Sequence, residues 1–64
     1  MEDWQKRVIK EKQDLDVKRA KLDLFMGSKL YTDIETEQKL LLADQYIKMT
    51  EYSHILGRRI ETFK

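Results

Sequence analysis

The chain has 64 residues, of which 13 are Lys or Arg and 12 are Asp or Glu, and its formal net charge is +1. It contains no cysteine and no proline. A disulfide scaffold and a cysteine zinc site are therefore excluded, and the near-neutral charge does not favour a strong DNA or RNA binder. The longest apolar run covers only residues 40–43, whereas a membrane span needs about 20 residues. We expect one small domain, residues 1–64, in the soluble interior of a cell.

A first helix is predicted over about residues 3–26, which contain no glycine and are rich in good helix formers. Five of its apolar residues share one helical face at spacings of seven, four and three: Trp4, Val8, Leu15, Leu22 and Phe25. Gly27 follows the last of them, where we expect a left-handed C-cap. A turn is predicted over about residues 27–33.

A second helix is predicted over about residues 34–63. Thr32 and Glu35 have the spacing of a capping box, with Asp33 as the rival N-cap. The apolar stripe comprises Leu42, Met49, Leu56 and Phe63, widened by Leu41, Ile55 and Ile60. Gly57 lies inside this helix, where we expect another helix to approach closely, with local fraying of the last turn as the alternative.

These elements predict an all-α protein built as an antiparallel helical hairpin. Such a hairpin buries one stripe per helix, and this chain has no disulfide or metal to add stability. We therefore expect a homo-oligomeric helix bundle, with a dimer as the simplest closed form and a higher ring as the alternative. The residues expected at the oligomer interface are Trp4, Leu41, Met49, Ile55, Leu56, Ile60 and Phe63.

Polar residues interrupt both stripes at intervals of seven: Glu11, Lys18, Gln45, Tyr52 and Arg59. Folding the hairpin at its turn gives three expected pairs: Lys18 with Gln45, Glu11 with Tyr52, and Trp4 with Arg59. In a structural interpretation these residues pair through hydrogen bonds and cation–π contacts, and so fix the register of the helices. In a functional interpretation the seam between the helices opens into a cleft for an anionic or planar ligand.

No pattern of residues indicates catalysis. His54 has no histidine or cysteine partner, and Glu51, Ser53 and His54 are too close in sequence to face one another on a helix. A glycine-rich phosphate loop and a paired-carboxylate cleft are both absent from the sequence. We therefore expect a protein that is not an enzyme, with no metal site and no cofactor.

The second half of the chain has the spacing Gln-x3-Met-x2-Tyr-x2-Ile-Leu-x2-Arg-Ile, residues 45–60. With Arg7-Val8-Ile9 in the first half, it resembles a family of short, largely uncharacterised helical proteins of tailed bacteriophages and prophages. The resemblance covers nearly the whole chain but not the turn, where the family often has a segment ending in Leu-Pro. It implies a phage accessory protein in the host bacterial cytoplasm.

Small phage proteins without catalysis often act by binding, so the resemblance leads to competing hypotheses. The first is a counter-defence protein that sequesters a cyclic nucleotide or ADP-ribose-type immune signal in pockets between protomers. Tyr52 or Trp4 would stack on a base, and the basic side chains would meet phosphates. The residues expected to bind this ligand are Arg7, Lys18, Gln45, Tyr52 and Arg59.

The alternative is a structural or protein-binding helical oligomer that engages a host or phage protein, such as a host defence protein, with no small-molecule ligand. A third hypothesis is the binding of paired RNA loops by one helix face, and the small net charge counts against it. We expect no membrane partner.

Overall fold

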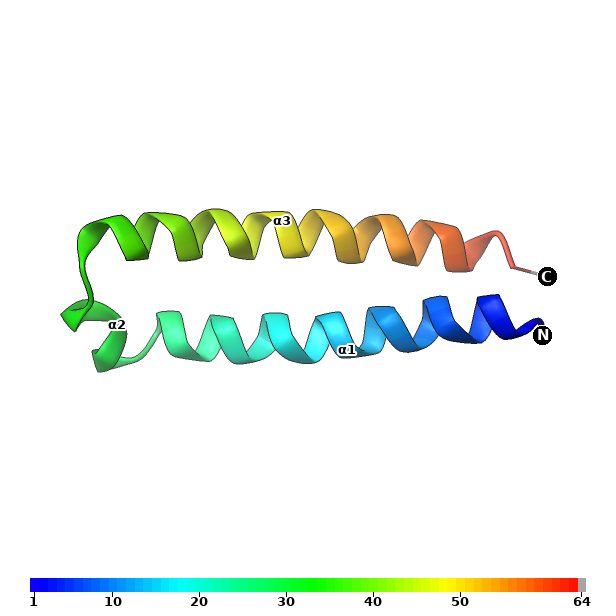
Figure 1. Cartoon of the computed structure of the whole chain (residues 1–64), viewed down its shortest axis with the longest axis horizontal. Helices are drawn as coiled ribbons and strands as arrows, with labels where there is room; N and C mark the ends of the chain where they lie inside the picture. Colours follow the sequence, from blue (N-terminus) through cyan, green and yellow to red (C-terminus); the bar gives the residue numbers. More distant parts are fainter. Residues whose placement is uncertain (64) are drawn as a thin grey trace.

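The computed structural model describes residues 1–63, and every regular element in this range is an α-helix. The order is α1 (Asp3–Met26), α2 (Lys29–Asp33) and α3 (Thr36–Glu61). Figure 1 shows α1 and α3 side by side and antiparallel, with the short α2 at one end and both termini at the other. The all-α class expected from the sequence is confirmed.

α1 begins with a capping box at Glu2 and Gln5, and it ends without the left-handed cap expected at Gly27. At its start, the Glu2 backbone N–H donates to Oε1 of Gln5 at 2.8 Å. At its end, Gly27 has φ −89°, so the left-handed C-cap expected there is wrong. The N–H of Gly27 donates to the carbonyl of Asp23, and the Ser28 N–H donates to Phe25. The chain therefore leaves α1 through an ordinary right-handed turn.

The segment between the long helices is more helical than expected. α2 occupies most of the predicted turn, and Thr32 and Asp33 lie inside it. The N-cap of α3 is Glu35, so α3 starts at Thr36 and the predicted capping box at Thr32 does not form. The Thr32 hydroxyl instead donates to the carbonyl of Lys29 at 2.6 Å, within α2 itself.

Contacts of Tyr31 close this end of the molecule. Its ring packs edge-on against Phe25, with ring centroids 6.0 Å apart, and its hydroxyl donates to the Lys39 carbonyl at 3.0 Å. The Lys39 ammonium donates to the carbonyl of Thr32 at 3.0 Å. Tyr31 thus joins the end of α1 to the first turn of α3, and these bonds stabilise the extra helical turn.

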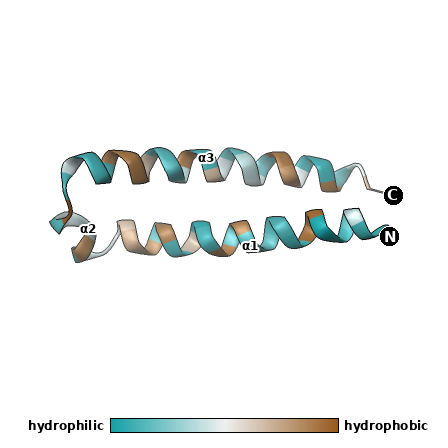
Figure 2. Ribbon diagram, in the orientation of Figure 1, coloured by the Kyte–Doolittle hydropathy of each residue, from teal (hydrophilic) through white to brown (hydrophobic). Residues whose placement is uncertain are grey.

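The molecule is a thin rod that leaves much apolar surface exposed. Its extents are 46 × 15 × 13 Å, and its radius of gyration is 14.7 Å, against about 11 Å for a compact chain of this length. Only Val8 and Leu56 are buried apolar side chains among residues 1–63. Figure 2 shows hydrophobic segments all along both long helices. More than half of the side chain is exposed in Val17, Leu24, Leu30, Leu40, Leu41, Ile47 and Ile55.

No helix within residues 1–63 is both long enough and apolar enough to cross a bilayer.

Candidate functional site

The seam between α1 and α3 contains a different polar column from the one expected. Glu11 and Lys18, which were placed on the seam, are exposed. Lys12 and Arg19, one residue further along, are partly buried there, and Ser53 of α3 is only 4% exposed. The predicted column is therefore displaced from the seam onto one flank of the helix pair.

The polar residues of the seam hydrogen-bond across it and form what we call the seam cluster: Lys12, Asp16, Arg19, Thr50 and Ser53. The Lys12 ammonium donates to Oδ2 of Asp16 at 2.7 Å and to the Ser53 hydroxyl at 3.2 Å. The Ser53 hydroxyl donates to Oδ1 of Asp16, and Arg19 donates to the Thr50 hydroxyl at 3.3 Å. The hydrogen bonds from Lys12 and from Ser53 lower the pKa of Asp16, outweighing the opposing effect of burial. Asp16 is therefore the one anion of the cluster, and it lies 2.7 Å from the Lys12 ammonium and 3.9 Å from the Arg19 guanidinium.

The sequence predicts the wrong polar column at the seam because a seven-residue apolar repeat leaves two neighbouring columns of helix positions. Either column could be buried between the helices. Between Val8 and Leu15, both Glu11 and Lys12 lie on the apolar face. A neglected signal was the column of small residues at Ala43, Thr50 and Gly57, all partly buried. A Cβ added at Gly57 would lie 3.3 Å from Cε of Lys12. The close approach expected at Gly57 is present, and the approaching group is the Lys12 side chain.

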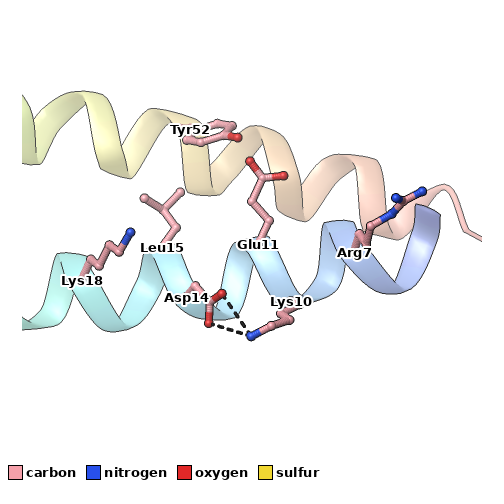
Figure 3. Close-up of a pocket in the computed structure, with 7 residues that line it drawn as sticks. All are labelled: Arg7, Lys10, Glu11, Asp14, Leu15, Lys18 and Tyr52. Atoms are coloured by element: carbon pink, nitrogen blue, oxygen red, sulfur yellow. Dashed lines mark hydrogen bonds and ion pairs between the residues drawn. The ribbon is translucent and has the colours of Figure 1, made fainter. Parts of the chain in front are cut away.

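The flank carries an open groove of about 390 Å³, which we call the Tyr52 groove (Figure 3). It includes three of the five residues expected to bind a ligand: Arg7, Lys18 and Tyr52. Its full lining is Arg7, Lys10, Glu11, Asp14, Leu15, Lys18 and Tyr52. All but Tyr52 come from α1, so a single aromatic side chain of α3 faces a charged surface of α1.

The charges in this groove are only partly neutralised. Lys10 and Asp14 pair at 3.3 Å, in an exposed position. Arg7, Glu11 and Lys18 have no ion-pair partner within 4 Å among the described residues. Figure 3 shows the Glu11 side chain reaching from α1 toward the Tyr52 ring, with Arg7 and Lys18 on either side along the helix. Tyr52 is 44% exposed, so part of its side chain is accessible to a ligand.

None of the three expected pairings forms a hydrogen bond or a stacking contact in residues 1–63, although Glu11 reaches toward Tyr52 (Figure 3). Trp4 packs edge-on against Phe63, with ring centroids 5.1 Å apart, and makes no stacking contact with Arg59. The Gln45 amide donates to the Met49 sulfur at 3.8 Å, and no hydrogen bond joins it to Lys18. Gln45 and Arg59 are exposed and lie outside the lining of the Tyr52 groove.

One residue expected at the oligomer interface is unavailable for that role in this conformation. Leu56 is 0% exposed because it is enclosed between α1 and α3. Trp4, Leu41 and Ile55 remain about half exposed, so they are free to meet a copy. The other residues expected there are partly buried: Met49, Ile60 and Phe63.

A second groove of about 300 Å³ borders the seam cluster. Of its basic residues, Lys12 and Arg19 are already hydrogen-bonded to Asp16 and Thr50. Arg58 is exposed, but no Phe, Trp or Tyr lines this groove to stack on a ligand. No group of three potential metal ligands occurs in the part of the chain that the structure describes. The Tyr52 groove is therefore the better candidate site.

Comparison with protein families identifies one match. The model of the Sequestin family matches residues 2–62, nearly the full length of the chain. The chain belongs to the Sequestin family. The family name denotes sequestering, which implies a binding role. The searches among curated proteins and among solved structures gave no match.

Proposed function

We propose that this chain is a non-enzymatic phage accessory protein that sequesters a nucleotide immune signal of its host, acting in the bacterial cytoplasm. The proposal rests on one observation. In a chain of a family named for sequestering, a half-exposed aromatic ring faces cations without ion-pair partners across an open groove. A ring face and free cations are the two kinds of group that a nucleotide needs from a protein.

Different residues of the groove are suited to different parts of a nucleotide. Tyr52 offers a π-face for a base, and stacking tolerates any base because every base has a flat face. Arg7 and Lys18 offer charge to phosphates, Arg7 through a fork that matches two phosphate oxygens. These two residues are eleven positions apart on α1, about 16 Å along the axis. With the base on Tyr52, a phosphate of the ligand can therefore meet one cation or the other, according to the side of the base on which it lies.

A second copy of the chain is the natural cover for the groove. The accessible surface is 5239 Å², against about 4,400 Å² for a compact monomer of 7.8 kDa. The excess is similar to the roughly 800 Å² that each partner buries in a standard interface. Gln45 and Arg59 lie seven residues before and after Tyr52, on the same helical face. A copy packed along this flank would bring them to the edge of the site.

We expect the protein to be a dimer or higher oligomer at micromolar concentration, because residues 1–63 of one copy enclose only two apolar side chains. Sedimentation equilibrium across a concentration series measures the mass directly. Chemical unfolding at several concentrations provides the second readout, since the midpoint of an obligate oligomer rises with concentration. A monomeric mass, with cooperative unfolding that is independent of concentration, would contradict the shared site.

Ligand binding is tested with a calorimetric panel of cyclic dinucleotides, cyclic trinucleotides and ADP-ribose derivatives. We expect at least one to bind, and Tyr52→Ala to weaken its binding by about 5- to 150-fold, since stacking contributes about 1–3 kcal/mol per base. Tyr52→Phe keeps the ring and should retain binding. For the phosphate contacts, Lys18→Ala should weaken binding, whereas Lys21→Ala, which alters an exposed lysine outside the groove, should not.

If the folded protein binds none of these compounds, the proposal is wrong. The remaining candidate would be a protein-binding oligomer without a small-molecule ligand. The exposed Leu40 and Ile47, seven residues apart on α3, favour it because they form an apolar stripe away from the Tyr52 groove.

A further inference from the structure

The Tyr52 groove contains a carboxylate, Glu11, which phosphate binding does not explain. Its carboxylate stands between two cations of α1 and reaches toward Tyr52 (Figure 3). It has no ion-pair partner within 4 Å in residues 1–63, whereas the other acid of the groove, Asp14, is paired with Lys10. A free carboxylate repels phosphate and can only accept hydrogen bonds. A ligand that fills the groove and displaces water from this carboxylate therefore has to offer it a hydrogen-bond donor.

The position of Glu11 indicates which donor it meets. In a nucleotide the sugar connects the base to the phosphate. With the base on Tyr52 and phosphate at Arg7 or Lys18, the sugar lies over the span of α1 between these cations, where Glu11 stands. A carboxylate accepts well from ribose hydroxyls, a role that acidic residues perform in dinucleotide-binding folds. Its two oxygens can accept from two adjacent hydroxyls.

We infer that Glu11, facing Tyr52 across the groove, binds the vicinal 2′,3′-diol of a ribose and so selects nucleotides that keep both hydroxyls free. The inference rests on the proposed function and adds the class of ligand. Nucleotides whose 2′- or 3′-oxygen is linked to phosphate lack this diol at that sugar and are disfavoured. A site that hydrogen-bonds a hydroxyl rejects the analogue that lacks it, because the acceptor is left unpaired.

The test compares ADP with 2′-deoxy-ADP and 3′-deoxy-ADP by calorimetry on the full chain. We expect ADP to bind at least 10-fold more tightly than either deoxy analogue. Glu11→Gln should remove most of this preference: binding of ADP weakens, while binding of the deoxy analogues stays the same or tightens as the carboxylate no longer repels phosphate. A merely structural role for Glu11 would weaken all three ligands together.

Asp14→Asn is the matched control, because it removes a carboxylate of the same groove that is already paired. It should keep the preference for ADP. A preference that survives Glu11→Gln overturns the inference. So does tight binding of a cyclic dinucleotide without a vicinal diol that is lost in Tyr52→Ala, although that result leaves the proposed function standing. If no nucleotide binds the folded protein, both the inference and the proposed function fail.

Discussion

Replacing Leu56 with alanine should lower the free energy of unfolding by about 2–5 kcal/mol, the usual range for removing a fully buried leucine side chain. Leu56 is 0% exposed, and only one other apolar side chain among residues 1–63 is buried, Val8. Domains of this size are stabilised by about 3–10 kcal/mol in total. We therefore expect the Leu56→Ala protein to be largely unfolded at temperatures where the wild type is folded.

Urea unfolding followed by circular dichroism, at one fixed protein concentration, measures this change. Leu24→Ala is the matched control, because Leu24 is 76% exposed on α1 and the same atoms are removed without leaving a cavity. Its effect should stay within about 0.5 kcal/mol. Leu56→Met, which nearly conserves volume, should cost less than about 1.5 kcal/mol. Equal losses for Leu56→Ala and Leu24→Ala would show that the seam does not hold the fold together.

The sequence was most informative where local preference and burial agree. The long helices are amphipathic at seven-residue spacing and rich in helix formers, and α1 has the bounds expected of it, Asp3–Met26. The turn was harder to predict, because Thr32 has the properties of a good N-cap and equally of a helix interior. Whether Thr32 caps a helix or lies inside one depends on Tyr31 and Lys39, whose contacts join α2 to α3. These contacts exist only once the chain is folded.

The candidate site shows a different limit of sequence reasoning. The residues placed on the seam, such as Glu11 and Tyr52, do share one face, but that face is the flank. A seven-residue repeat fixes the spacing of a column and leaves open which of two neighbouring columns is buried. The choice follows from hydrogen bonds across the seam, where Lys12 and Asp16 of α1 both bond to Ser53 of α3. Partners on another helix cannot be read from spacing within one helix.

Three site residues nevertheless came together in one groove because they are on the same flank: Arg7, Lys18 and Tyr52. Gln45 and Arg59 follow the same repeat but lie further along α3, beyond the groove. The thinness of the rod explains both results. With two helices, every flank position is exposed, so a shared face makes a surface and only a further copy can make it an enclosed pocket.

The second large effect is expected at Asp16, which accepts hydrogen bonds from Lys12 and Ser53. Asp16→Asn should lower the free energy of unfolding at pH 6 by about 1–3 kcal/mol, the usual cost of losing hydrogen bonds to a charged group. The buried Ser53 hydroxyl loses its charged acceptor, and Lys12 loses its counter-charge next to Gly57. Asp14→Asn, at an exposed carboxylate paired only with Lys10, should change stability by less than about 0.5 kcal/mol.

The same cluster predicts how the effect depends on pH. Hydrogen bonds from Lys12 and Ser53 lower the pKa of Asp16 in the folded protein, whereas in the unfolded chain it returns to about 3.9. A lowered folded pKa means that the unfolded state binds the proton more tightly, so acid favours unfolding. The stabilisation by Asp16 is therefore complete above the unfolded pKa and is lost as the pH falls through the folded pKa.

The free energy of unfolding is measured for the wild type and for Asp16→Asn at pH 6, 4 and 2.5. We expect the two values to converge as the pH falls. The difference in stability between the two proteins should be largest at pH 6, begin to shrink near pH 4 and be smallest at pH 2.5. Since every other carboxylate is common to both proteins, their titration cancels in this difference. A gap that stays constant from pH 6 to pH 2.5 would mean that the contribution of Asp16 to stability does not depend on its charge.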